Sequence, residues 1–377
     1  MEYQKKMSVL RRTKMKAAIN INSIKALVVK VLFARLLPHQ KLEHQDLTGK
    51  NAIVTGSNTG LGKEMARHLA EMNATVYLAC RNMEKAEAAK QDILKSVPKA
   101  TIHIVQLDTS TLENCARFCD TWDKDGKTVD ILMHNAGVGG PPDADHVYGP
   151  DGYEHMYMTN FLSNVLITHR LEKYFAPNAR VVMTASPGCY VGGFTPRFAK
   201  QSVKNEMEVG FHYVKGQLPT NSILYCQSKL SQLCFAKALN KKWRLEGKDY
   251  VAHAFNPGYA ASDFFQTETV KTSKRSVDPI WWLLTAGFNL ALPSREGCKT
   301  GVMCAVTPSK KVASNGGRLF DRMKPNTSIV DMYGDQMFED LWNRWCVDSG
   351  ISWSYLTDEL HSEGSVDEIS TAATMEK

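Results

Sequence analysis

From residue 51 onward, short apolar segments rich in β-branched residues alternate with longer segments of helical periodicity. This alternation predicts parallel strands joined by helices that cover both faces of one sheet, which is a doubly wound α/β domain. The expected strands are 51–55, 75–79, 101–107, 129–133, 180–184 and 250–255. The expected helices are 61–72, 83–94, 112–122, 152–175 and 223–245.

The chain divides into three parts around this pattern. Its 377 residues, 43% hydrophobic and 23% charged, have the composition of an ordinary globular protein. We predict a single domain at 46–350, preceded by an extension at 1–45 and followed by a polar tail at 351–377. The net charge of +7 comes from the extension, whose first 41 residues hold ten Lys or Arg and one acid. A nearly neutral domain makes nucleic acid an unsuitable partner.

The basic extension contains one amphipathic helical pattern, at 17–37, which stops near Pro38. Three basic residues interrupt its apolar run, so it falls short of the ~18 uncharged residues that a membrane-spanning helix needs. Two interpretations remain open. The helix either packs on the fold or anchors an otherwise cytoplasmic protein to the surface of a membrane.

Nine cysteines are scattered along the chain without a Cys-x-x-Cys pair. No histidines stand near them at the spacing of a metal site, so we expect no metal centre. Buried small apolar side chains in a reducing compartment are the expectation instead.

A glycine-rich turn follows the first expected strand and opens the first expected helix. This strand–turn–helix context is the one that a dinucleotide needs, because pyrophosphate binds at the N-terminus of a helix. Gly56 would allow the turn, Gly60 would let the backbone approach the pyrophosphate, and Gly62 would let the helix pack closely on the sheet. The expected cofactor-binding residues of the turn are Gly56, Ser57, Asn58, Thr59, Gly60, Leu61 and Gly62.

Three further positions lie at the carboxyl ends of expected strands, the edge at which open α/β sheets bind ligands. Arg81 follows the second strand, where a carboxylate would select NAD; an arginine could pair with a 2′-phosphate instead. We therefore expect NADP(H) to be preferred over NAD(H). Asp108 follows the third strand, although it could equally cap a helix, and Asn135, Ala136 and Gly137 follow the fourth.

Tyr225 and Lys229 are one helical turn apart and could transfer a proton beside that cofactor. A phenol with an ordinary pKa of about 10 is a poor acid or base at neutral pH. A lysine ammonium on the same helix face would favour the phenolate and lower the pKa of Tyr225. The pair is therefore a candidate for general acid–base chemistry on a substrate oxygen.

Several motifs occur in a fixed order between residues 48 and 345. They are 55–62, 79–82, 107–108, 135–137, Asn160, Ser186, 225–230 and 256–258. In this order they resemble the short-chain dehydrogenase/reductases, nearest the retinol-dehydrogenase-like branch, which also contains many fungal natural-product reductases. The resemblance implies a Rossmann fold and hydride transfer to or from a nicotinamide cofactor.

The resemblance also implies roles for individual residues. Ser186, Tyr225 and Lys229 would be the catalytic triad, with Asn160 as a fourth member that holds a proton-relaying water. Tyr225 and Lys229 would also contact the cofactor. Further cofactor contacts are implied for Pro257, Gly258 and Ser262. His134 and Ala185 depart from the usual pattern, but neither change removes a catalytic group.

Two segments are expected to cover the substrate. One lies around 192–216, where the chain is longer than in compact members of the branch, and the other around 262–295. The second includes an uncharged aromatic stretch at 279–293, which favours a lipophilic substrate. The same stretch could instead pack against the core, against a partner subunit of a homo-oligomer, or on a membrane surface.

The leading hypothesis is an NADP-dependent oxidoreductase acting on a lipophilic ketone, aldehyde or secondary alcohol, in line with a role in secondary-metabolite biosynthesis. Two alternatives remain. One is a non-catalytic NADP(H)-binding sensor or scaffold, which would have no need of a phenol–ammonium pair. The other is an NAD-dependent alcohol dehydrogenase.

Overall fold

The structure is a computed structural model. It describes residues 38–139, 148–190, 192–194, 221–258, 260, 291–308, 312, 314–326 and 329–355. The expected helix at 17–37 and the tail from 356 lie outside these residues. So do most of the two expected substrate-covering segments and Ser262.

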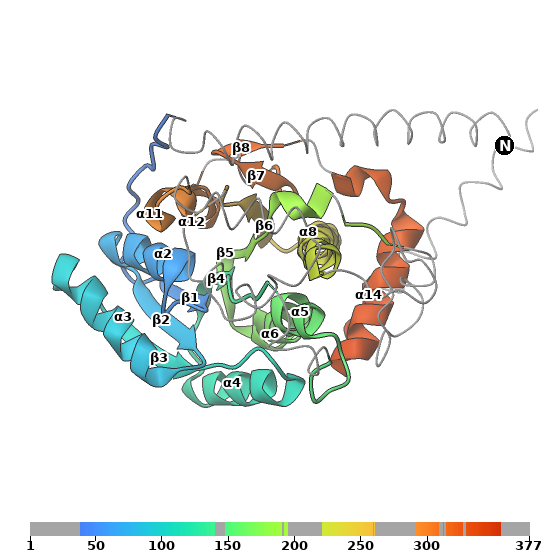
Figure 1. Cartoon of the computed structure of the whole chain (residues 1–377), viewed down its shortest axis with the longest axis horizontal. Helices are drawn as coiled ribbons and strands as arrows, with labels where there is room; N and C mark the ends of the chain where they lie inside the picture. The colour runs from blue at the N-terminus through green and yellow to red at the C-terminus, as the bar shows by residue number, and fades with distance from the viewer. Residues whose placement is uncertain are drawn as a thin grey trace, which may run out of the picture.

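One mixed sheet forms the centre of the described molecule (Figure 1). Its strand order is β3-β2-β1-β4-β5-β6-β7-β8; the strands run parallel except β8, which is antiparallel to β7. The strands are β1 (Asn51–Thr55), β2 (Thr75–Cys80), β3 (Ile102–Gln106), β4 (Val129–His134), β5 (Phe175–Thr184), β6 (Val251–Asn256), β7 (Leu319–Asp321) and β8 (Lys324–Pro325). This confirms the doubly wound Rossmann fold.

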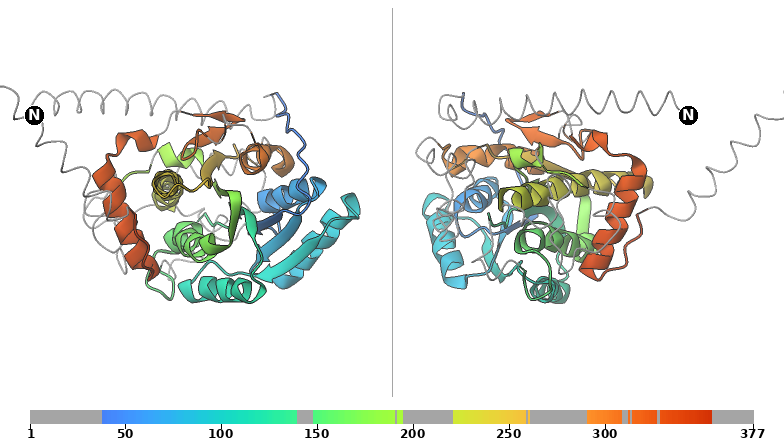
Figure 2. Two further views of the ribbon diagram at one scale, coloured as in Figure 1. Left: turned by 180° about the vertical axis from the view of Figure 1, so that it is seen from behind. Right: turned by 45° about the vertical axis from the view of Figure 1, so that its right-hand side comes forward.

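Helices cover both faces of the sheet, so its strands are apolar on both sides (Figures 1 and 2). Neighbouring residues of one strand enter different cores: Ile53 faces one layer of helices, while Ala52 and Val54 face the other. One layer contains α2 (Gly60–Glu71), α3 (Met83–Ser96), α11 (Ser294–Gly297) and α12 (Lys299–Val306). The opposite layer contains α4 (Leu112–Asp125), α6 (Ser163–Leu171) and α8 (Asn221–Leu245), with α14 (Asp335–Ser349) packed outside α6 and α8.

The direction of winding reverses between β1 and β4, which pair with each other in the middle of the sheet. Chains leave these two neighbouring strands toward opposite faces, which opens a crevice at their carboxyl ends. The glycine-rich turn after β1 and the loop after β4 both lie at this edge. The fold therefore places a ligand site where the sequence motifs are.

The expected helix at 152–175 is divided in the structure. It starts only at α5 (His155–Tyr157), continues as the π-helix η2 (Met158–Leu162) and α6, and ends in the short turn η3 (Glu172–Tyr174). Glu154 fixes the start, because its carboxylate accepts from the backbone N–H groups of Met156 (2.9 Å) and Tyr157 (2.7 Å). β5 then begins at Phe175, five residues earlier than expected.

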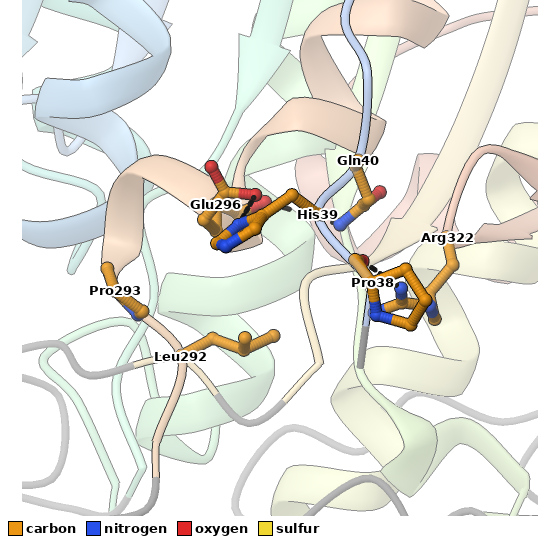
Figure 3. A pocket seen from close by; sticks show the side chains of 7 residues that line it. All are labelled: Pro38, His39, Gln40, Leu292, Pro293, Glu296 and Arg322. Atoms are coloured by element: carbon orange, nitrogen blue, oxygen red, sulfur yellow. Dashed lines mark hydrogen bonds and ion pairs between the residues drawn. The ribbon is translucent and has the colours of Figure 1, made fainter. Parts of the chain in front are cut away.

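The described chain begins at Pro38 and crosses the α11–α12 side of the domain before β1 (Figure 1). The Gln40 side chain accepts from Thr300 Oγ1 at 2.5 Å and donates to the Glu296 backbone oxygen at 3.3 Å. Arg322 donates to the Pro38 carbonyl at 2.5 Å. A pocket of about 230 Å³ lies between this segment and α11 (Figure 3), and no catalytic candidate lines it.

Candidate active site

The glycine-rich turn after β1 brings backbone N–H groups to the edge of the sheet. Gly56 (φ +63°) and Gly60 (φ +55°) adopt left-handed conformations, which favour glycine. Helix α2 then starts with no side-chain cap and no acid in its first turn, whereas α3 and α4 are capped by Asn82 and Thr111. The uncapped N-terminus leaves its donors for an anion.

The loop after β4 packs directly against this turn. Asn135 Nδ2 donates to the carbonyls of Thr55 and Gly56, each at 3.1 Å, and Thr55 Oγ1 accepts from the backbone N–H groups of Asn135 (2.9 Å) and Ala136 (3.0 Å). A Cβ on Gly62 would stand 2.4 Å from Asn135 Nδ2. Gly62 therefore serves close packing, as expected, and the two halves of the crevice form one rigid unit.

Ser57 faces inward, away from the crevice. Its side chain is fully buried and donates to the Val54 carbonyl at 2.8 Å. Its hydroxyl is therefore committed to the turn, and only its backbone remains for a ligand. Asn58, Thr59 and Leu61 are partly exposed.

Arg81 and Asp108 lie at the carboxyl ends of β2 and β3, on the far side of the turn from β4. Arg81 is exposed, and no residue in the described part of the chain pairs with it. Asp108 does not cap α4: that cap is Thr111, whereas Asp108 accepts from the Ser110 N–H at 3.0 Å. Both charges act on the partly buried His155, whose pKa is lowered by burial and by Arg81 and raised by Asp108. Sequence reasoning missed His155.

These features fit a nicotinamide dinucleotide. The uncapped start of α2 suits a pyrophosphate, and the exposed cation of Arg81 follows β2, the strand after which such folds contact the adenosine ribose. Such a cofactor would be held by the turn from Gly56 to Gly62, by Arg81 and by Asp108. It would supply the hydride chemistry that protein side chains lack.

The catalytic candidates Ser186, Tyr225 and Lys229 come together next to this crevice. Ser186 hydrogen-bonds the Tyr225 hydroxyl, and its Oγ also accepts from the Gly188 N–H at 3.1 Å. The Lys229 Nζ lies 5.6 Å from the centre of the Tyr225 ring and donates to the Thr184 carbonyl at 2.7 Å. The Thr184 carbonyl at the end of β5 thus positions Lys229, and Ser186, two residues further along the chain, positions the Tyr225 hydroxyl.

Burial shifts the pKa values of both ionisable members of the triad. It raises the pKa of Tyr225, and the hydrogen bond with Ser186 only partly opposes this. The Tyr–Lys spacing predicts a shift in the other direction, so that expectation is wrong for the net effect. Burial also lowers the pKa of Lys229 to about 7, which leaves this side chain only partly charged at neutral pH. Groups that stabilise the charged form of Lys229 therefore determine whether it carries a positive charge next to Tyr225.

Asn160 lies in the π-helix η2 and is fully buried. Its Oδ1 accepts from the Val138 N–H at 2.7 Å, while its Nδ2 donates to the Val138 carbonyl and to Ser228 Oγ, both at 3.0 Å. The side chain thus fastens the loop after β4 to α8 next to Lys229. The wider turn of a π-helix, often found at functional sites, aims this amide across the helix interface.

Pro257 and Gly258 follow β6, at the same carboxyl edge of the sheet. Gly258 (φ +74°) donates its N–H to Asn256 Oδ1 at 2.9 Å. A Cβ on Gly297 of α11 would stand 3.0 Å from the Pro257 carbonyl and 3.2 Å from the Leu61 side chain. Helix α11 therefore braces both the turn after β6 and the start of α2.

The surroundings of the triad include polar residues that motif spacing did not reveal. Thr184 offers a carbonyl to Lys229, Ser228 holds Asn160, and Gln232 Oε1 accepts from Lys229 Nζ at 3.1 Å. Ser228 lies inside the Tyr225–Lys229 turn. In the sequence, only its position between Tyr225 and Lys229 indicated that it lies at the site.

Comparisons with known proteins agree with this geometry. The family model of the short chain dehydrogenases matches residues 50–196. The chain is 30% identical to retinol dehydrogenase 12 of Homo sapiens over 311 residues, which cover 81% of this chain and 88% of that protein. It is also 30% identical to retinol dehydrogenase 13 of Homo sapiens over 302 residues, covering 78% and 83%.

Solved structures support the fold. An uncharacterised protein from Mycobacterium paratuberculosis matches with a TM-score of 0.61 at 21% identity, covering 83% of this chain and 97% of that one. A protein from Shigella flexneri, described as a short chain dehydrogenase complexed with NADP, matches with a TM-score of 0.53 at 18% identity, covering 75% and 100%.

The chain belongs to the short-chain dehydrogenase/reductase family, in its retinol-dehydrogenase-like branch. It is an oxidoreductase that uses a nicotinamide cofactor to interconvert an alcohol and a carbonyl group.

Proposed function

We propose that this protein transfers hydride between NADP(H) and a lipophilic ketone, aldehyde or secondary alcohol. The observation that carries the proposal is the meeting of Ser186, Tyr225 and Lys229 beside the crevice at the carboxyl ends of β1 and β4. A binding module has no use for a phenol–ammonium pair at that place.

In the proposed reaction a nicotinamide cofactor held by the turn from Gly56 to Gly62 would supply or take up the hydride. Tyr225 gives its hydroxyl proton to the substrate oxygen in reduction, or takes the proton in oxidation. Ser186, which already bonds the Tyr225 hydroxyl, donates a hydrogen bond to the same oxygen and stabilises its developing charge. The Lys229 charge favours the phenolate and offsets part of the effect of burial. Asn160 holds α8 against the loop after β4 by bonding both.

The test of this proposal is hydride transfer by the full-length protein and by a Tyr225→Phe variant, followed as NADPH oxidation with a panel of hydrophobic aldehydes and ketones that includes retinal. General acid–base catalysis is typically worth about 10²- to 10⁴-fold, and we expect Tyr225→Phe to lose that much in kcat. Tyr174→Phe is the matched control, because it removes a hydroxyl that donates to Asp123 on α4, at 2.9 Å. Wild-type turnover that survives in Tyr225→Phe would contradict the proposal.

Arg81 supports the preference for NADP(H) over NAD(H), because its exposed guanidinium stands at the end of β2 where the family distinguishes the two cofactors. Replacing Arg81 with Asp should lower the ratio of NADPH to NADH kcat/KM by about ten- to a hundred-fold, the value of a hydrogen bond to a charged group. Arg117→Asp on α4 makes the same charge change away from the crevice and should leave the ratio unchanged. An unaltered ratio in Arg81→Asp would show that Arg81 does not recognise the 2′-phosphate.

The non-catalytic sensor or scaffold considered from the sequence makes a different prediction. It predicts cofactor binding with no turnover, and a Tyr225→Phe variant with full biological activity. Cofactor affinity measured by fluorescence, together with the turnover assay, separates the two functions.

The substrate class rests on the relatives and on the apolar stretch at 279–293, of which 279–290 lies outside the described residues. We propose that this stretch and 192–216 cover a lipophilic substrate. The likeness to fungal natural-product reductases, and with it a role in secondary metabolism, stays a prediction.

We further propose a cytoplasmic protein that contacts a membrane surface through residues 1–45 or 279–293, with homo-oligomerisation still to be measured. In the part of the chain that the structure describes, no helix is long and apolar enough to cross a membrane. The basic charge of the extension supports attraction to anionic lipid.

A further inference from the structure

Lys229 is held by two acceptors that come from different elements. Its Nζ donates to the Thr184 carbonyl at the end of β5 at 2.7 Å and to Gln232 Oε1, one turn further along α8, at 3.1 Å. A side chain on Gly137 would stand 3.5 Å from Nζ, so the lysine head lies beside the loop after β4. The backbone carbonyl cannot turn away, whereas the Gln232 amide can.

A chain of buried hydrogen bonds fixes the orientation of that amide. Gln232 Nε2 donates to Asn164 Oδ1 at 2.8 Å, and Asn164 Nδ2 donates to Ser163 Oγ at 3.2 Å. Ser163 Oγ in turn donates to the Thr159 carbonyl at 3.0 Å. Gln232, Asn164 and Ser163 are at most 1% exposed, so solvent does not compete for these bonds.

In this series of hydrogen bonds, every N–H or O–H group points away from Lys229 and every acceptor oxygen points toward it. Each amide therefore presents its negative end to the ammonium. If the Asn164 oxygen were absent, Gln232 could turn over and bring its NH₂ group against Nζ, where it would repel the positive charge. The orientation of one amide thus depends on an acceptor 68 residues away in the sequence.

We propose that Asn164 and Gln232 form an amide pair that positions the Lys229 head and stabilises its charged form, so that Lys229 can act on Tyr225. Both are positioning residues, because they act through Lys229, and their role in the reaction rests on the proposed function. The pair also ties α6 to α8 directly behind the catalytic helix turn.

The charge of Lys229 depends strongly on such acceptors. Within the described residues, burial alone accounts for its lowered pKa of about 7, and no charged group opposes the shift. Tyr225 is the titratable neighbour on its own helix. The groups that meet it from β5, from the loop after β4 and from η2 are the Thr184 carbonyl, Gly137 and Asn160, which do not titrate. Among these neighbours, the Gln232 amide oxygen is therefore the acceptor whose orientation toward Lys229 can change.

The experiment titrates Lys229 directly in the full-length protein. Lysine is labelled with ¹³C at Cε, the Lys229 signal is assigned with Lys229→Met, and its shift is followed against pH. A hydrogen bond to a charged group corresponds to about one to two pKa units, so we expect Gln232→Met and Asn164→Leu each to lower the Lys229 pKa by about one unit or more. Ser231→Ala is the matched control, because Ser231 is a fully buried polar residue of α8 that donates to the Gln227 carbonyl at 3.0 Å, and it should leave the titration unchanged.

Gln232→Glu gives an opposite and independent result. A carboxylate at this position should raise the Lys229 pKa by at least one unit, since Asn164 can turn its NH₂ group toward the new acceptor. This variant keeps the test decisive if Gln232→Met does not fold. A Lys229 titration that stays within 0.3 units (~0.4 kcal/mol) of wild type in Gln232→Met or Gln232→Glu would overturn the inference.

The pH profile of kcat/KM then connects the pair to the reaction. In Gln232→Met the limb governed by Tyr225 should move to higher pH, because a less charged lysine stabilises the phenolate less. An unmoved limb, despite a changed Lys229 pKa, would overturn the link to catalysis. If instead the wild-type protein shows the Lys229 titration but transfers no hydride, the proposed function fails while the assignment of the amide pair stands.

Discussion

Replacing Lys229 with Met should make the protein more stable at neutral pH, although it removes a member of the proposed catalytic triad. The Lys229 side chain is buried, and burial lowers its pKa from 10.5 to about 7. In the unfolded chain the amine binds its proton about 3.5 units more tightly, and each unit corresponds to about 1.4 kcal/mol. At pH 7 the native state therefore loses ~4 kcal/mol relative to a lysine that ionises normally.

Two lost hydrogen bonds oppose this gain. Methionine leaves the Thr184 carbonyl and Gln232 Oε1 without their donor, at about 1–3 kcal/mol. The net increase in the free energy of unfolding should then be roughly 1–3 kcal/mol at pH 7. Packing effects do not depend on pH, whereas the ionisation effect does.

The sign of the pH dependence follows from proton binding. Between pH 7 and 10.5 the unfolded wild type binds more protons at this lysine than the native state does, so wild-type stability rises with pH. The advantage of Lys229→Met should shrink by about 2 kcal/mol between pH 7 and pH 9. Urea unfolding of both proteins at the two pH values measures this difference.

Lys242→Met is the control on the same helix. Lys242 is also buried, but its ammonium pairs with Glu246, so its loss should destabilise the protein. An advantage of Lys229→Met that is equal at pH 7 and pH 9 would refute the reasoning, since the charge of Lys229 would then cost nothing on folding.

Two further predictions concern the start of α5 and the basic extension. Burial raises the pKa of Glu154 from 4.5 to about 7, so the native state binds the extra proton between these values and wild-type stability should fall by about 2 kcal/mol from pH 5 to pH 7. Glu154→Gln should remove that fall in urea unfolding; a decline that persists would assign it to another group. Deleting residues 1–37, which keeps the docked segment from Pro38 onward, should abolish flotation with anionic liposomes; equal flotation of both proteins would exclude the extension as the anchor.

The sheet could be predicted closely from the sequence because its strands are apolar on both faces. β1 has the predicted bounds, and β2, β4 and β6 differ from them by one residue. β5 begins five residues early because the strand extends from the apolar run back toward the N-terminus, as far as Phe175. The strands after residue 256 were not predicted, since β7 and β8 are only three and two residues long, and the helices α11, α12 and α14 were not predicted either.

The division of the helix at 152–175 could not be predicted from periodicity. The apolar pattern continues through Asn160, yet the backbone widens there into a π-helix, because the buried amide needs partners on Val138 and Ser228. Those partners lie 22 and 68 residues away. A helical period carries no information about contacts at such separations.

The same limit applies to the chemistry of the site. Spacing placed Tyr225 and Lys229 on one helix face, and the structure brings them together with Ser186. Spacing gave the wrong sign for the pKa shift of Tyr225, because burial, which depends on the whole fold, raises that pKa. Gln232 and Asn164 are ordinary amides in the sequence, and only the packing of α6 on α8 makes them partners.

The energetic cost of Lys229 explains why its surroundings are so fully bonded. A buried ammonium without a counter-ion is retained against a penalty of several kcal/mol, so its acceptors must be held in place by other groups. Thr184 is held by the pairing of β5 with β6, and Gln232 by Asn164. A carboxylate beside Lys229 would remove the penalty, but under the proposed function it would also neutralise the charge that acts on Tyr225. Neutral oxygens hold the lysine in place and leave its positive charge for that proposed role.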